Sequence, residues 1–117
     1  PACACAAAEA ALELIAECPS EREKLLTAAC GLRNRLQDAG FNVPQTTTPI
    51  IPVIIGDAGR AADIAAKLLA RDILLPAIRP PTVPPGSSRL RISLCAGHNG
   101  EQIDTLVDRL KEFATVT

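Results

Sequence analysis

A cluster of prolines in the second half of the chain constrains its fold more than any other feature. Five prolines lie from Pro76 to Pro85. Each proline fixes its own φ, removes a backbone N–H donor and disfavours the helical conformation of the residue before it. We therefore expect a stiff, extended connection in this part of the chain.

Three short segments have the patterns of strands. Arg89–Cys95 alternates, with Leu90, Ile92 and Leu94 on one face and Arg89, Arg91, Ser93 and Cys95 on the other. Ile50–Ile55 is a continuous apolar run that predicts a mostly buried strand. Pro52 cannot donate to a strand ladder, so this strand is expected at an edge or a bulge. Ile73–Ile78 predicts one more short strand.

The first part of the chain predicts two helices separated by Pro19. Ala2–Glu17 has a helical pattern, with Leu12, Ile15 and Ala16 on one side. Ser20 and Glu23 form a capping box that is expected to start the second helix, and Gly40 is expected to stop it. The inward stripe of this helix is expected to be Leu25, Ala29, Leu32 and Leu36. The opposite, solvated face is expected to be Arg22, Arg33, Arg35 and Asp38.

Two further helices carry clear start signals. Asp57 is expected to cap a helix whose inward residues are Ala61, Ile64, Ala65, Leu68 and Leu69. Asn99 with Gln102 is expected to cap a last helix with the stripe Ile103, Leu106, Val107, Leu110 and Phe113. The resulting order predicts an α+β fold, a two-layer domain with helices packed on one side of a small, mainly antiparallel sheet.

Composition limits the class of protein. The 117 residues fit one domain, and a net charge of −1 with interspersed signs argues against a nucleic-acid partner. No apolar run approaches the roughly 20 residues of a membrane span. The Ala-rich opening is interrupted by Glu9, Glu13 and Glu17 and does not resemble a signal peptide. We expect a cytoplasmic protein.

The cysteines are five in number: Cys3, Cys5, Cys18, Cys30 and Cys95. On a helix, Cys3 and Cys5 would point about 200° apart, so they could not clamp one metal ion. No CxxC pair occurs. The favoured interpretation is five reduced, mostly buried thiols, with a zinc site or a disulfide framework as the alternatives.

The proline-rich segment and the strand after it hold the candidate binding residues. Arg79 lies in the stiff segment, and Arg91 lies on the non-core face of the predicted strand. Two guanidinium groups near one sheet edge suit a carboxylate, because the planar fork can bind it through two hydrogen bonds. The alternative is that Arg79, Arg89 and Arg91 are ordinary surface charges or form structural ion pairs.

The same residues carry a resemblance to a known family. The series is an Arg-Pro-Pro-Thr-Val-Pro segment, a glycine, an Arg-Leu-Arg strand, a histidine and a closing amphipathic helix, here Arg79–Pro84, Gly86, Arg89–Arg91, His98 and Ile103–Leu110. It resembles the end of the α-oxoamine synthases, a branch of the fold-type I pyridoxal-phosphate (PLP) enzymes. The similarity covers essentially the whole chain. It implies the C-terminal small domain of a PLP-dependent transferase.

The resemblance also implies substrates and roles. Family enzymes join an amino acid to an acyl thioester with loss of carbon dioxide, and Ile78–Pro84 looks most like the branch that uses L-alanine and a pimeloyl thioester. By similarity, Arg91 holds the amino-acid carboxylate, and Arg79 and Thr82 lie beside the acyl substrate. His98 matches the signature and is expected to be structural. The family implies a homodimer for the full-length enzyme.

A catalytic lysine is the missing part of this pattern. Lys24, Lys67 and Lys111 all fall on charged faces of predicted helices, without the surroundings that activate an amine. In the family, that lysine and the groups that bind PLP belong to a large domain. With no methionine in the chain, residues 1–117 are expected to be one C-terminal domain, inactive alone. The alternatives are another α-oxoamine synthase, such as a 2-amino-3-ketobutyrate ligase, or a non-catalytic module that binds a carboxylate or a partner protein.

Overall fold

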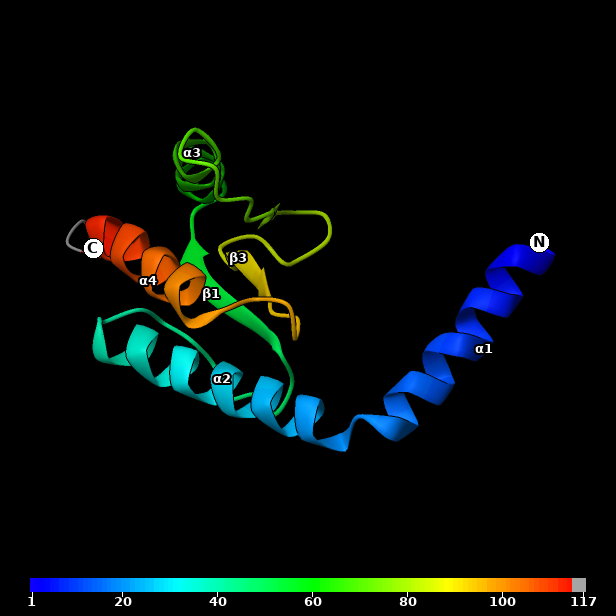
Figure 1. The fold of residues 1–117 in the computed structure, drawn as a ribbon. Coiled ribbons are helices and arrows are strands. Elements are labelled where there is room, and N and C mark those ends of the chain that lie inside the picture. Colours follow the sequence, from blue (N-terminus) through cyan, green and yellow to red (C-terminus); the bar gives the residue numbers. More distant parts are fainter. Residues whose placement is uncertain (115–117) are drawn as a thin grey trace.

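Helices and strands follow one another in the order that the sequence predicts. The computed structural model describes residues 1–114. The elements are α1 (Ala2–Glu17), α2 (Pro19–Asp38), β1 (Ile50–Gly56), α3 (Ala58–Leu69), β2 (Ala77–Ile78), β3 (Ser88–Ser93) and α4 (Gly100–Ala114) (Figure 1).

The three strands form an antiparallel sheet in the order β1-β3-β2. Pro52 lies in β1, which is an edge strand, as predicted. Ile51 pairs with Ile92 and Val53 with Leu90, and all four side chains are buried. The predicted alternation of β3 and the predicted α+β class are confirmed.

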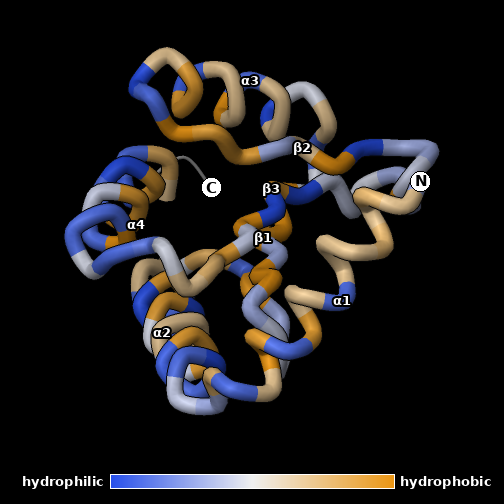
Figure 2. The backbone as a smooth tube through the Cα atoms, turned by 45° about the vertical axis from the view of Figure 1, so that its right-hand side comes forward, coloured by the Kyte–Doolittle hydropathy of each residue, from blue (hydrophilic) through white to orange (hydrophobic). Residues whose placement is uncertain are grey.

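One hydrophobic core joins three helices to the face of the sheet that carries Ile51, Val53, Leu90 and Ile92. Figure 2 shows apolar segments of α2, α3 and α4 turned toward the strands. The helical residues buried in the core are Ala29, Leu32, Leu36, Ile64, Leu68, Leu106, Val107 and Leu110. Leu25, Ile103 and Phe113 are partly buried against it. The inward stripes predicted for α2 and α4 are therefore confirmed.

Helix ends that depend on local chemistry agree with the prediction in three of four cases. The Asp57 carboxylate accepts the Arg60 N–H at 2.7 Å. Asn99 and Gln102 cap α4 reciprocally, at 2.9 and 3.0 Å. Gly40 has φ +89° just beyond α2, and its N–H donates to the Gln37 carbonyl at 2.9 Å. A residue in this left-handed conformation ends a helix, which is why glycine suits the position.

The predicted capping box of α2 is wrong. The helix begins at Pro19, with Cys18 as its N-cap and no side-chain cap bond, so Ser20 already lies inside it. Proline has the φ of a first helical residue and no N–H that would be left without a partner. Pro19 therefore starts this helix as well as separating it from α1.

Arg33 is a second correction, because it was expected on a solvated face. Its exposed fraction is only 8%. The guanidinium donates to the carbonyl oxygen of Thr46 and to the Cys30 sulfur, the latter at 3.2 Å. The segment between α2 and β1 folds back over this side of the helix, and helical periodicity carries no information about such a return.

Two predictions around α3 also need correction. Leu69 was expected to face inward but is 57% exposed, whereas Ala65 is partly buried against the core, as predicted. The strand expected over Ile73–Ile78 is limited to Ala77–Ile78. The residues before Ala77 instead form a loop that begins at Asp72, which has φ 62°.

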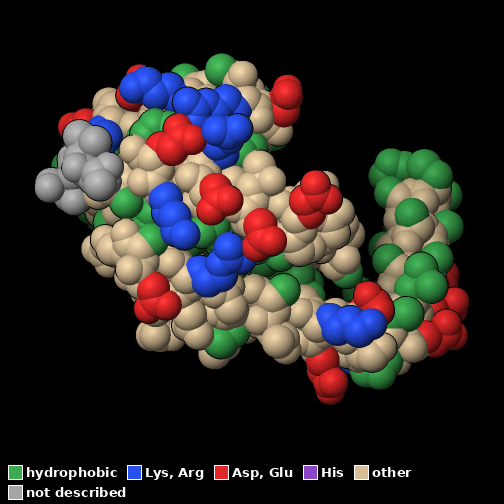
Figure 3. Space-filling view, turned by 60° about the vertical axis from the view of Figure 1, so that its left-hand side comes forward, with side chains coloured by type: hydrophobic (Ala, Val, Ile, Leu, Met, Phe, Trp, Pro, Cys, Tyr) green, Lys and Arg blue, Asp and Glu red, His purple; other side chains and the backbone are tan. Residues whose placement is uncertain are grey.

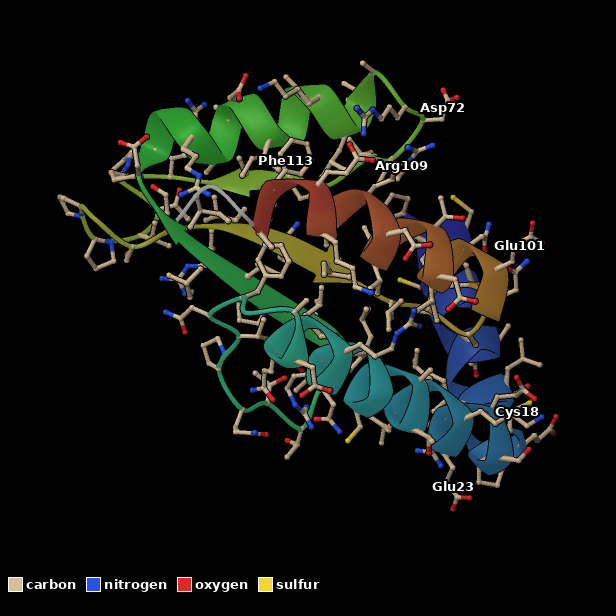
Figure 4. The ribbon with its side chains drawn as sticks, turned by 90° about the vertical axis from the view of Figure 1, so that its left-hand side faces the viewer. Cys18, Glu23, Asp72, Glu101, Arg109 and Phe113 are labelled. Carbon is tan, nitrogen blue, oxygen red and sulfur yellow. The ribbon has the colours of Figure 1, made fainter. Side chains whose placement is uncertain are left out.

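Helix α1 stands apart from the rest of the molecule (Figure 1). It buries no residue, and Leu12 and Ile15 are 68% and 50% exposed. Cys18 marks its junction with α2 (Figure 4). No helix in the described part of the chain is long and apolar enough to cross a membrane.

The cysteines are free, but the expected burial is wrong, because all five are exposed. Cys3 and Cys5 lie on α1, which buries none of its residues. Within residues 1–114, no three His, Cys, Asp or Glu side chains converge as a metal ion would require.

Candidate functional site

A groove of about 690 Å³ lies where the sheet is incomplete. One wall is the loop Arg71–Pro76, and the floor is Arg91–Ser93 of β3 with the adjoining Leu94. The other wall is the start of α4 with the turn before it. The size falls within the usual range of small-molecule sites, roughly 300–1,000 Å³.

The groove exists because β2 is so short. Ala77 pairs with Leu90, and the Arg91 N–H donates to the Pro76 carbonyl at 3.1 Å. Among the described residues, no backbone hydrogen bond joins Ser93 to the segment before Pro76. The chain thus leaves the edge of β3 beyond Arg91, and the space between them is open.

Of the two arginines that line the groove, Arg71 and Arg91, only Arg91 has no side-chain hydrogen bond to a described residue. It lies opposite Pro52 on the face of the sheet that the helices do not cover. Six of the nine arginines donate to a described residue, while the side chains of Arg22, Arg79 and Arg91 have no such partner. Of these three, only Arg91 lines the groove. A free guanidinium beside apolar walls can bind a carboxylate through two hydrogen bonds.

Arg79 and Thr82 lie outside this groove. Both are exposed, in the loop between β2 and β3, where the Thr82 N–H donates to the Arg79 carbonyl at 3.0 Å. The structure does not bring them to the walls around Arg91. Their role beside an acyl substrate stays a prediction.

His98 closes the turn between β3 and α4. Its Nδ1 accepts the backbone N–H of Cys95 at 3.1 Å, and the His98 N–H donates to the Cys95 carbonyl at 3.1 Å. The Cys95 sulfur lies 3.4 Å from the same Nδ1. This turn connects β3 to the start of α4, and both line the groove. The hydrogen bonds between His98 and Cys95 therefore hold the two elements in position relative to each other.

Comparison with known proteins shows the family to which the chain belongs. The family model for aminotransferase class I and II matches residues 1–110. The chain belongs to that family. A putative 8-amino-7-oxononanoate synthase of Acetivibrio thermocellus is 46% identical over 92% of this chain. An 8-amino-7-oxononanoate synthase of Anaeromyxobacter dehalogenans is 45% identical over 96% of this chain. The chain spans about 28% of the length of each of these relatives.

Solved structures agree with this placement. A serine palmitoyltransferase of Sphingomonas wittichii superposes with a TM-score of 0.75 and 30% identity, over 80% of this chain and 24% of its own. The 8-amino-7-oxononanoate synthase of Francisella tularensis gives 0.76 at 19% identity, over 89% and 30%, and shares the fold. Another matched serine palmitoyltransferase was solved with PLP. The resemblance to the α-oxoamine synthases is confirmed.

The described residues do not form a complete PLP site. No lysine lines the groove. Lys24 and Lys67 form exposed ion pairs with Glu21 and Asp63, at 3.2 and 2.7 Å. Figure 3 shows basic and acidic side chains interspersed over one side of the molecule rather than gathered at one place. The groove therefore offers a carboxylate contact but no amine that could hold the cofactor.

The loop wall was missed by sequence reasoning. Interpreting Ile73–Ile78 as one strand concealed the segment that leaves the sheet. Asp72 lies at the turn where this wall begins (Figure 4). Pro76 was the available signal, because a proline has no N–H to donate and often marks the end of a strand ladder.

Proposed function

We propose that this chain is the substrate-binding, C-terminal part of a PLP-dependent 8-amino-7-oxononanoate synthase. The whole protein would join L-alanine to a pimeloyl thioester with loss of carbon dioxide, a step of biotin biosynthesis. The observation that carries this proposal is the unpaired Arg91 in its groove, in a chain whose relatives bear that name.

The described residues would bind and orient substrate. Arg91 would hold the carboxylate of the amino acid, which limits rotation of the reacting carbon. The apolar walls, including Leu94 and Ile103, would exclude water and strengthen that charged contact. Arg79 and Thr82, which lie outside the groove, would contact the part of the acyl thioester that extends beyond it. PLP, when bound, supplies the electron sink for the chemistry.

The remaining parts of the enzyme would lie outside these residues. A large domain would provide the lysine and the other contacts to PLP, so the 117-residue chain alone would be inactive. The full-length protein would be a cytoplasmic homodimer. The share of the relatives' length that this chain spans, about 28%, supports this division.

The test is Arg91→Ala in the full-length protein. Loss of a charge-assisted contact to the substrate carboxylate costs roughly 2–5 kcal/mol, so kcat/KM for L-alanine should fall by about tens to thousands of fold. Arg91→Lys should recover part of the loss. Arg22→Ala removes another unpartnered arginine, outside the groove, and is the matched control. An unchanged kcat/KM in Arg91→Ala would contradict the proposal.

A second candidate is another activity of the same family. The 30% identity with a serine palmitoyltransferase over 80% of this chain favours testing it. Wild-type enzyme assayed with L-alanine, glycine and L-serine, each with pimeloyl and palmitoyl thioesters, separates the candidates. A preference for L-serine with the palmitoyl thioester, or for glycine, would assign the chain to a different branch.

A further inference from the structure

Leu74 is an apolar side chain in an unusual place. It is 76% exposed, the most of any large apolar residue in the described part of the chain, whereas the adjacent Leu75 is 6% exposed. Leu74 lines the groove that also contains Arg91. An exposed leucine on the wall of a groove is available to contact a ligand, whereas scattered surface leucines need no such explanation.

The pairing of the strands places Leu74 on the side of Arg91. Ala77 lies opposite Leu90, and both Ala77 and Leu75 pack against the core. Pro76 accepts the Arg91 N–H and is exposed. Because side chains alternate along an extended segment, Leu74 and Pro76 turn away from the core, as Arg91 does.

The groove therefore combines a free cation with an apolar wall. Its volume of about 690 Å³ is far larger than an amino acid as small as alanine requires. Ile73, Leu94 and Ile103 add apolar lining to the groove from the side of the core. A carboxylate at Arg91 leaves room for an aliphatic chain along this wall.

We propose that Leu74 is a specificity-determining residue that contacts the aliphatic chain of the acyl thioester. This inference rests on the proposed function, in which Arg91 holds the carboxylate of the amino acid. Burial of the exposed Leu74 side chain against the methylene groups of the acyl substrate would favour longer chains over shorter ones.

The experiment measures kcat/KM of the full-length enzyme for a series of acyl thioesters that differ by single methylene groups. With wild type, each methylene buried in the groove should raise kcat/KM by up to about fourfold. Leu74→Ala should reduce this increment and lower kcat/KM for the pimeloyl thioester by about fivefold, with KM for L-alanine unchanged. Leu74→Met should restore most of the increment. Leu69→Ala, which truncates a leucine that is 57% exposed and outside the groove, should match wild type.

Other outcomes would overturn the inference. An unaltered chain-length increment in Leu74→Ala would exclude the acyl contact. A change confined to KM for L-alanine would assign Leu74 to the amino-acid side chain instead. A lower Tm with unchanged kinetics would make Leu74 a contact to another part of the protein. Inactive wild-type enzyme with every acyl thioester would contradict the proposed function itself, which is a distinct result.

Discussion

At the scale of single residues, a small ion-pair network connects the loop wall of the groove to the end of α4, beyond the part of that helix that lines the groove. Glu112 near the end of α4 accepts hydrogen bonds from Arg71, where the loop wall begins, and from Arg109 at 3.1 Å. Figure 4 shows Arg109 and Asp72 on the same side of the molecule. The hydrogen bond from Arg71, followed by that from Arg109, lowers the pKa of the Glu112 carboxyl group.

This lowered pKa predicts a pH-dependent effect of Glu112→Gln. Because the folded-state pKa lies below the unfolded-state value, ionised Glu112 stabilises the fold above the unfolded-state pKa. That stability is lost as the pH falls through the folded-state pKa. Wild type should therefore have a slightly higher Tm than Glu112→Gln at neutral pH, with the difference disappearing in acid.

Thermal unfolding between pH 2 and 7 checks the Glu112 prediction. The three side chains are 41–47% exposed, so the difference in Tm should be small and should shrink further at about 1 M salt. Asp108→Asn, on the same helix and without an ion pair among the described residues, is the control. A difference in Tm that is the same at every pH would contradict the prediction.

At the scale of single elements, α3 shows how narrow the buried stripe of a helix can be. Leu68 has no exposed surface and Leu69 is 57% exposed, although the two are neighbours and both were predicted to face inward. Successive helical residues point about 100° apart, so only one of the two can lie at the centre of the buried stripe. The sheet contacts the Ala61, Ile64 and Leu68 side of the helix.

Two leucine truncations in α3 should accordingly differ in cost. Leu68→Ala creates a cavity in the core and should lower the free energy of unfolding by about 2–5 kcal/mol. Leu69→Ala removes surface that is mainly solvated and should change it by less than about 0.5 kcal/mol. Urea denaturation with a common m-value measures both. Equal costs would show that Leu69 is packed as first expected.

At the scale of the whole molecule, α1 is the part least supported by the rest. It has 16 residues and buries none of them, while α4 has 15 residues and buries Leu106, Val107 and Leu110. Most of the stability of a helix in a protein comes from the packing of its apolar face, and α1 buries no residue. The contrast between the two helices predicts different local stabilities.

Hydrogen exchange of the 117-residue chain tests this contrast. Amides of α1 should exchange rapidly, and those in the middle of α4 should approach the protection set by global unfolding. In the proposed full-length enzyme, any surface that covers Leu12 and Ile15 would slow exchange in α1. Equal protection of α1 and α4 in the 117-residue chain would contradict the prediction.

Local chemistry in the sequence determined the order of the elements, the caps at Asp57 and Asn99, the end of α2 at Gly40 and the buried face of β3. These features depend on neighbouring residues, on backbone conformation and on periodicity, all of which are present in the sequence. The resemblance carried by Arg79–Arg91 identified the family for the same reason, because the motif is contiguous.

Only the tertiary structure decided which residues share the groove. It brought Arg91, Leu74 and His98 to one site, left Arg79 and Thr82 outside it, buried Arg33 and exposed the cysteines. These outcomes depend on the path of the loops between helices and strands. Two loop residues, Pro76 and Thr46, accept hydrogen bonds from Arg91 and Arg33. The contacts made there join residues distant in the sequence, so no local pattern determines them.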